Sequence, residues 1–172
     1  MPVVNIKLAD LGKTLRGDVR GRKERALKAL RLVVRTHGPR LAVEEVERAS
    51  PKPVDRGTYR RGFQVADIKD GASLYNAALH AGVIEEGRRP GARQPPTAVI
   101  EAWLRRKLRV AIKEGRHAQM SPSAYRGVAF VIARAIGRRG LPAHHILAKV
   151  DARLRPLVMA EVQKALAAPG PP

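Results

Sequence analysis

The chain of 172 residues contains no cysteine, and only 3% of its residues are aromatic. The lack of cysteine excludes disulfide bonds and thiolate metal sites. With so few aromatic residues, the core must consist mostly of leucine, valine, isoleucine and alanine. No apolar run approaches the roughly 20 residues that span a bilayer, and the N-terminus lacks the pattern of a secretory signal. These absences predict a soluble protein made in a cytoplasm.

Acidic residues are also scarce, with 15 Asp and Glu against 34 Lys and Arg, so the formal net charge is +19. Most of the excess lies in residues 101–172. A charge of this size implies a polyanionic neighbour, either nucleic acid or an acidic protein surface. Arginine outnumbers lysine, however, and GC-rich coding favours the same composition without any selection for binding. Composition alone leaves these explanations open.

Apolar residues at three- and four-residue spacing predict a long helix from Asp18 to Ala49. Gly38-Pro39 interrupts the pattern, so we expect this helix to be kinked or broken there. The same periodicity predicts three further helices. They begin at Thr97, after Ser121 as the N-cap, and at about Ile146, the last one kinked or restarted at Pro156 and ending near Ala167.

Between these helices the pattern changes to alternation, which is typical of strands. We expect a strand over residues 59–65, a hairpin turn at Lys69-Asp70-Gly71 and a return strand over residues 72–76. A short helical turn over residues 79–86, closed by Gly87, follows. The fold class is therefore α+β: a long N-terminal helix, a small antiparallel sheet with a hairpin, and flanking C-terminal helices. Residues 1–17 form an arm or short strand, 18–167 a single domain and 168–172 a frayed tail.

No pattern in the chain predicts catalysis, a cofactor or a metal ion. The histidines lack the spacing of metal ligands, and no glycine spacing matches a phosphate-binding loop. Glu85 and Glu86 are neighbours on a helical turn, so we interpret them as surface residues that pair with Arg88 and Arg89. Trp103 lies on the apolar face of its predicted helix and is expected to anchor the core or an interface.

Two arginine clusters are candidates for contact with phosphate or with an acidic partner. The first is Arg88, Arg89 and Arg93, on a loop of residues 88–96 that proline and glycine keep irregular. The second is Arg138-Arg139, at the end of a predicted helix. Guanidinium groups grip phosphate or carboxylate through two hydrogen bonds. A solvated loop tip is the equally weighted alternative, and no aromatic residues alternate with the arginines to stack bases.

Two stretches of the chain carry a recognisable pattern: residues 51–65, which read Pro-Lys-Pro-Val-Asp-Arg-Gly-Thr-Tyr-Arg-Arg-Gly-Phe-Gln-Val, and residues 75–91, which run from Tyr75-Asn76 to Glu85-Glu86-Gly87 and Gly91. Together they resemble the tail-completion proteins of long-tailed bacteriophages, also described as head–tail joining, neck or minor tail components. In that family a helix ends at a Pro-Val-Asp-x-Gly turn, and a strand, a hairpin and a segment ending in Glu-x-Gly follow. The clear match covers residues 51–104, about a third of the chain. Arg56 departs from the family pattern, in which threonine is commonest at that position. The matching turn and sheet residues are Pro53, Val54, Asp55, Gly57, Tyr59, Arg60, Phe63, Tyr75, Glu85 and Gly87.

The resemblance implies a non-enzymatic virion protein of the phage neck or tail, present in the host cytoplasm before assembly. Such proteins form a ring, usually a hexamer, that joins or completes the tail at the head–tail interface. The implied partners are further copies of this chain, a head-side connector or stopper protein, and a tail terminator or tail tube protein. Non-specific contact with packaged double-stranded DNA is compatible with the basic charge. No membrane, cofactor or small-molecule substrate is implied.

The alternative is a stand-alone basic nucleic-acid-binding protein, of the nucleoid- or ribosome-associated kind. A ring-forming connector predicts extensive subunit interfaces and little DNA affinity as a monomer. A nucleic-acid-binding protein predicts tight, steeply salt-dependent binding by the isolated chain.

Overall fold

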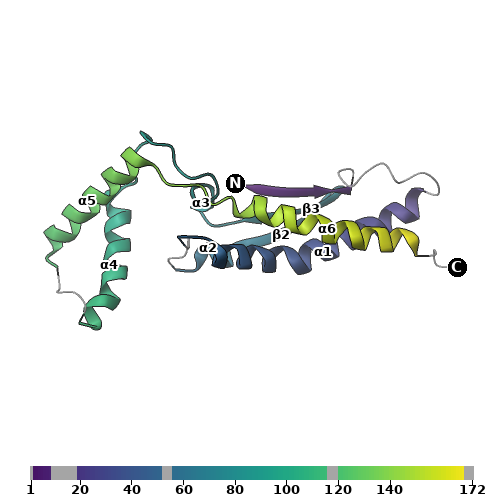
Figure 1. Ribbon diagram of the computed structural model, residues 1–172, viewed down its shortest axis with the longest axis horizontal. Coiled ribbons are helices and arrows are strands. Elements are labelled where there is room, and N and C mark those ends of the chain that lie inside the picture. The colour runs from purple at the N-terminus through teal and green to yellow at the C-terminus, as the bar shows by residue number, and fades with distance from the viewer. Residues whose placement is uncertain (1, 9–18, 52–55, 116–119, 169–172) are drawn as a thin grey trace. The chain divides into compact units, whose positions relative to one another are not determined.

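The structure, a computed structural model, describes residues 2–8, 19–51, 56–115 and 120–168. Within them the chain is of mixed α+β class, with a long N-terminal helix, a small antiparallel sheet and C-terminal helices, as predicted (Figure 1). It divides into two compact units, Met1–Glu86 with His144–Pro172, and Gly87–Ala143. We call them the sheet unit and the helical-hairpin unit. The sequence predicts one domain over residues 18–167, a range that includes parts of both units.

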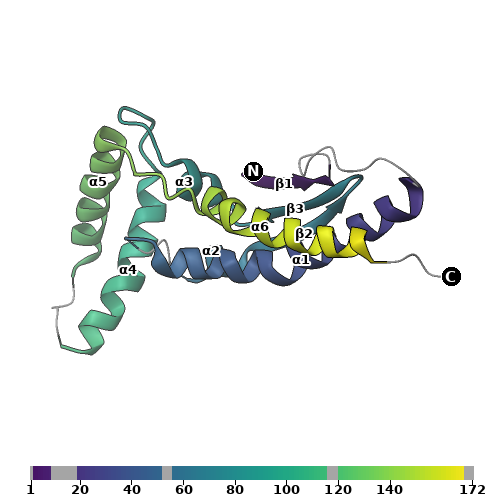
Figure 2. The ribbon, with the colours of Figure 1, turned by 45° about the vertical axis from the view of Figure 1, so that its right-hand side comes forward.

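In the sheet unit, the strand order is β1-β3-β2 and both strand pairs are antiparallel. α1 packs against β2 and β3, while α6 packs against α1 and β1 (Figure 1, Figure 2). Of the arm or short strand expected over residues 1–17, the structure has a short strand, β1, at Val3–Lys7. The described elements of the unit are β1 Val3–Lys7, α1 Val19–Arg48, α2 Thr58–Arg61, β2 Phe63–Ile68, β3 Gly71–Asn76, α3 Ala81–Glu86 and α6 Ile146–Ala167.

The sequence predicts a kink or a break at Pro39, and because helix α1 runs through Pro39 without a break, the break is wrong. A proline inside a helix costs about 3 kcal/mol through its lost hydrogen bond and its ring clash. Val34, Leu41 and Val46 are buried on both sides of it, and each contributes roughly 1.5–3 kcal/mol. Burial therefore outweighs the local penalty. α6 is likewise continuous through Pro156, so of the expected kink or restart the restart is wrong.

The strand predicted from Tyr59 begins later, at Phe63, and Tyr59 lies in the one-turn helix α2. The Gly57 carbonyl accepts from the Arg61 N–H at 2.9 Å, which closes this turn. Tyr59 is fully buried and packs edge-on against Phe63, with ring centroids 5.2 Å apart. Positions four residues apart share a face in a strand and in a helix alike, so the apolar pattern does not separate the two structures here. The hairpin turn and β3 follow as predicted.

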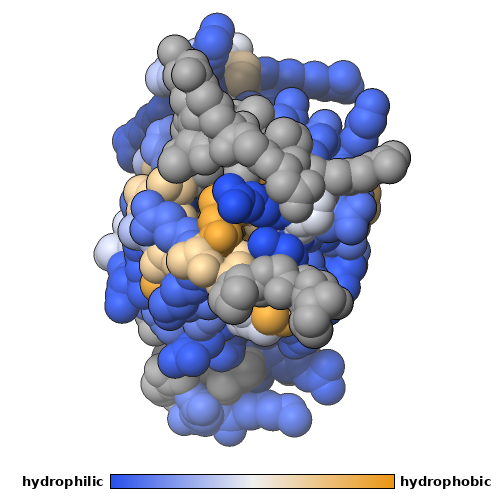
Figure 3. Space-filling model, turned by 90° about the vertical axis from the view of Figure 1, so that its right-hand side faces the viewer, coloured by the Kyte–Doolittle hydropathy of each residue, from blue (hydrophilic) through white to orange (hydrophobic). Residues whose placement is uncertain are grey.

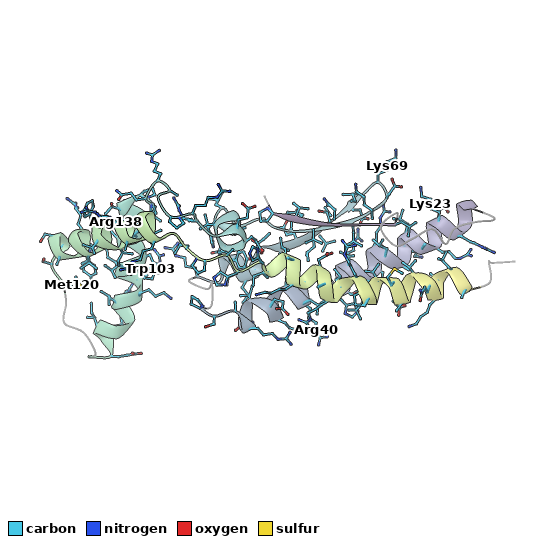
Figure 4. The ribbon with its side chains drawn as sticks, turned by 45° about the horizontal axis from the view of Figure 1, so that its top comes forward. Lys23, Arg40, Lys69, Trp103, Met120 and Arg138 are labelled. Carbon is cyan, nitrogen blue, oxygen red and sulfur yellow. The ribbon has the colours of Figure 1, made fainter. Side chains whose placement is uncertain are left out.

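The core of the sheet unit is aliphatic, as the composition predicts, and lies between α1, α6 and the sheet. Arg153 of α6 donates to two glutamates of α1, to Glu44 at 2.8 Å and to Glu45 at 2.7 Å. The hydrogen bond from Arg153 to Glu44 lowers the pKa of Glu44. Lys23 pairs with Asp70 in the hairpin turn, next to Lys69 (Figure 4). One end face of the unit is largely hydrophilic around a small hydrophobic area (Figure 3).

The helical-hairpin unit consists of α4 Thr97–Lys113 and α5 Pro122–Arg139, which pack against each other and confirm the predicted starts. Ser121 caps α5 by accepting from the Ala124 N–H at 3.2 Å. Leu104 of α4 and Tyr125 of α5 are buried, whereas Trp103 of α4, which is labelled in Figure 4, is only partly buried. No described helix of the chain is both long and apolar enough to cross a membrane.

Candidate arginine-rich interface

The positive charge is concentrated in the helical-hairpin unit. That unit holds thirteen Lys or Arg against two Glu, for a formal net charge of +11. The sheet unit, about twice as long, carries +8 because thirteen acidic residues offset its basic ones. Most described carboxylates of the sheet unit form ion pairs, for example Asp67 with Arg31 and Arg35. Unbalanced arginines therefore belong mainly to residues 87–143.

The two predicted arginine clusters are brought together by backbone hydrogen bonds. Arg88 and Leu141 bond each other twice, N–H to carbonyl, and both bonds measure 2.9 Å. The Gly91 N–H donates to the Gly137 carbonyl at 2.8 Å. These bonds join the loop of residues 88–96, which is irregular as predicted, to the end of α5. Residues some fifty positions apart in sequence thereby form one arginine cluster, which consists of Arg88, Arg89, Arg93, Arg138 and Arg139.

Glycine makes this close approach of loop and helix feasible. Gly140 has φ 75° and ψ −167°, a backbone conformation that is essentially restricted to glycine, and a Cβ there would overlap the Arg88 carbonyl oxygen. A Cβ on the buried Gly137 would lie 3.1 Å from the Cβ of Gln94. Gly87, at φ 71°, would overlap the Leu141 carbonyl in the same way. Glycines beside the loop and at the end of α5 therefore allow the close approach that brings the arginine cluster together.

The arginines of the cluster differ in how they are held. Arg88 is partly buried, and its guanidinium donates to the Arg93 carbonyl, so it braces the loop. The side chains of Arg89, Arg93, Arg138 and Arg139 are exposed, and none forms an ion pair with a described carboxylate. A groove of about 500 Å³ runs beside the loop. It is lined by Arg88, Arg93, Gln94, Pro95, Pro96 and Thr97.

This arrangement is suited to binding an anion. Exposed guanidinium groups without partners donate to phosphate or carboxylate oxygens without first breaking an internal ion pair. Not every basic group of the unit is equally available: Arg105 of α4 donates to Glu101 at 2.7 Å and lies 4.4 Å from the centre of the Tyr125 ring. The predicted contact residues Arg89, Arg93, Arg138 and Arg139 are thus placed together and accessible.

Glu85 contradicts the prediction of a surface ion pair. Its side chain is 4% exposed and accepts from the Tyr59 hydroxyl and from the Leu147 N–H, the latter at 3.1 and 3.3 Å. Burial, and then the bond to Glu85, raise the pKa of Tyr59. Glu85 thus binds the first turn of α6, where His145 provides no side-chain cap. Glu86, by contrast, is exposed.

Other residues of the same stretches of sequence form hydrogen bonds or ion pairs near this buried contact. Asn76, fully buried, donates to the Tyr59 carbonyl at 2.7 Å and accepts from the Ala78 N–H at 2.9 Å. Tyr75 donates to Gln64, and Arg60 pairs with Glu47 of α1 at 3.3 Å. Gly57 has φ 72° at the start of α2. Pro53, Val54 and Asp55 lie outside the described residues.

Sequence reasoning did not single out the outer face of α5 as a site. Phe130 and Val131 are 46% and 64% exposed there, next to the exposed Arg134. A usable signal was the four-residue spacing that places Phe130, Arg134 and Arg138 on one stripe of the helix. Exposed large apolar residues beside unpaired arginines are typical of a protein-binding surface.

Among the described residues, no group of three His, Asp or Glu is arranged to hold a metal ion. Comparison with models of known protein families, with curated proteins and with solved structures finds no match. The local geometry of the chain therefore carries the functional argument.

Proposed function

We propose that this chain is a structural subunit of the phage neck or tail, which assembles as a ring and joins or completes the tail at the head–tail interface. The observation that carries the proposal is the contact between Tyr59 and Glu85. The two stretches that resemble tail-completion proteins are separated by the hairpin in sequence, yet this buried hydrogen bond joins them. The two stretches thus meet in one set of buried hydrogen bonds that involves Tyr59, Asn76 and Glu85. This contact supports a fold in common with the tail-completion proteins.

Exposed apolar side chains and open sheet edges support assembly with other protein surfaces. β1 and β2 each pair with β3 alone, so each leaves one edge without a described partner strand. Unpaired edges and exposed apolar side chains favour contact with neighbouring chains. Leu79, between β3 and α3, is completely exposed, and Leu32 on α1 is 61% exposed. A ring with protein on both sides would cover such residues.

The purified chain should form closed rings, which we expect to be hexamers, and loss of its gene should leave heads and tails unjoined. Light scattering gives the mass of the assembly, and negative-stain electron microscopy shows both the rings and the particles. A chain that stays monomeric at every concentration, combined with normal particles from the deletion strain, would refute the proposal.

A second candidate, a stand-alone nucleic-acid-binding protein, is favoured by the net charge of +11 on the helical-hairpin unit. The two candidates differ in the affinity of the free chain for duplex DNA. A connector subunit binds DNA weakly and without sequence preference, whereas a dedicated binding protein binds tightly at physiological salt. Strong preference for one sequence that persists at high salt would favour the second candidate.

Neutralising Arg89 and Arg93 (Arg89→Gln, Arg93→Gln) should reduce the salt dependence of any DNA binding. Each lost phosphate contact lowers the slope of log K against log salt by roughly 0.9, so the pair should lower it by about 2. Arg88 is left intact because it braces the loop. Fluorescence anisotropy at several salt concentrations measures the slope. The control, Arg22→Gln with Lys28→Gln on α1, removes two exposed charges from the sheet unit and should change the slope less. An equal change in both variants would contradict phosphate contact by the loop.

A further inference from the structure

The outer face of α5 carries a shallow groove of about 350 Å³ that combines apolar and basic side chains. Phe130 and Val131 are 46% and 64% exposed there, and Arg138 and Arg139 are exposed at the other end. None of these arginines forms an ion pair with a described carboxylate. The groove is lined by Phe130, Val131, Arg134, Ala135, Arg138 and Arg139.

Helical geometry arranges these residues as two parallel stripes. Residues four apart lie on one face of a helix, so one stripe runs Phe130, Arg134, Arg138 and the other runs Val131, Ala135, Arg139. Both stripes start with a large apolar side chain and end with arginine. Eight residues at 1.5 Å each separate the two ends by about 12 Å. The surface therefore has a polarity, apolar at one end and positively charged at the other.

We propose that this groove binds an acidic segment of a partner protein, with apolar side chains placed over Phe130 and Val131 and carboxylates against Arg138 and Arg139. Charge complementarity selects an acidic partner, because the whole unit has only two acidic residues and neither lines the groove. The same face of a second copy would bring like charges together. Aromatic residues and arginine are also the residue types most enriched where binding energy concentrates in protein interfaces.

Duplex DNA fits this surface less well than a protein segment does. Contacts to the DNA backbone come from polar and charged donors, and the exposed Phe130 and Val131 provide none. An acidic segment satisfies both ends of the groove, since its carboxylates meet the arginines and its apolar side chains remove the two exposed residues from water. The inference names a surface for one protein partner of the proposed function. The test of the groove measures peptide binding by the isolated chain. If the peptide does not bind, the ring proposal still stands, and if no ring forms, the peptide-binding proposal still stands.

The test measures binding of the full-length chain to three fluorescein-labelled probes. The first is a helical peptide of about 16 residues with two adjacent leucines and, two turns away, a cluster of glutamates, a spacing of about 12 Å. The second replaces both leucines by serine at unchanged charge, and the third is a DNA duplex of about 20 base pairs. We expect the leucine peptide to bind about tenfold more tightly than the serine peptide, since each buried side chain contributes to affinity.

Substitution of the groove should remove that difference between the two peptides. Phe130→Ser with Val131→Ser should weaken the leucine peptide about tenfold and leave the DNA probe unchanged. Arg138→Gln with Arg139→Gln should weaken both peptides. The matched control is Val128→Ser, which changes another exposed apolar residue of α5 that does not line the groove, and it should alter nothing.

Circular dichroism and thermal unfolding establish that each variant keeps its fold. Equal binding of the two peptides by the unmodified chain would overturn the proposal. So would leucine-peptide binding that is insensitive to the Phe130 and Val131 substitutions. If the DNA probe, and not the leucine peptide, loses affinity in that variant, the groove is a nucleic-acid contact.

Discussion

Replacing Glu85 with alanine should lower the free energy of unfolding by about 3 kcal/mol. The carboxylate accepts from the Tyr59 hydroxyl and from the Leu147 N–H, and all three groups lie in the interior. Its removal leaves two buried donors without partners, at about 1–3 kcal/mol each, and deprives α6 of the group that binds its first turn. Chemical denaturation followed by circular dichroism measures the change.

The adjacent Glu86 gives a matched control, because it has the same side chain but is exposed. Glu86→Ala should change the free energy of unfolding by no more than about 0.5 kcal/mol. Tyr59→Phe, which removes one donor and leaves the carboxylate bound to Leu147, should fall between the two. Equal stability losses for Glu85→Ala and Glu86→Ala would show that Glu85 is not the buried acceptor described above.

Replacing Gly140 with alanine should release the loop of residues 88–96 from the end of α5. The backbone of Gly140 has φ 75° and ψ −167°, which costs another residue about 1–3 kcal/mol, and the new Cβ would overlap the Arg88 carbonyl. We expect the two Arg88–Leu141 hydrogen bonds to break and the arginine cluster to disperse. Hydrogen exchange of the Arg88 and Leu141 amides, which should speed up by at least about tenfold, measures the release.

Two other glycines separate the causes of this effect. Gly91→Ala tests positive φ alone, because Gly91 has φ 79° and open space around it, so it should cost about 1 kcal/mol. Gly82→Ala, within α3 and also in open space, should be neutral or stabilise by up to about 1 kcal/mol. If Gly140→Ala exchanges no faster than Gly91→Ala, the overlap with the Arg88 carbonyl does not position the loop.

Where local chemistry is unambiguous, the sequence predicts the fold well. Ser121-Pro122 provides both an N-cap and a proline in the first turn, and α5 begins at Pro122 as expected. Lys69-Asp70 supplies the hairpin turn, and β2 and β3 end and begin on either side of it. The helix starts at Thr97 and Ile146 are also confirmed. Each signal depends on residues within a few positions, so no distant contact is needed to interpret it.

Predictions fail where a local preference competes with burial. Pro39 disfavours a helix locally, yet the buried residues on both sides of it keep α1 continuous. The apolar pattern around Tyr59 fits a strand and a helical turn equally well. The structure has the helical turn, in which Tyr59 is buried and packs against Phe63. Glu85 looks like a surface carboxylate because neighbouring arginines are close in sequence, while its actual partners are 26 and 62 positions away.

By itself, the sequence determined the α+β class, the helix starts and hairpin named above, and the excess of arginine over acid. Only the tertiary structure decided that Glu85 is an interior acceptor, and that Arg88, Arg89 and Arg93 form one cluster with Arg138 and Arg139. The physical reason is the range of the interactions. Caps, turns and periodicity act between near neighbours, whereas the Arg88–Leu141 bonds and the burial of Glu85 depend on segments that meet only after the chain has folded.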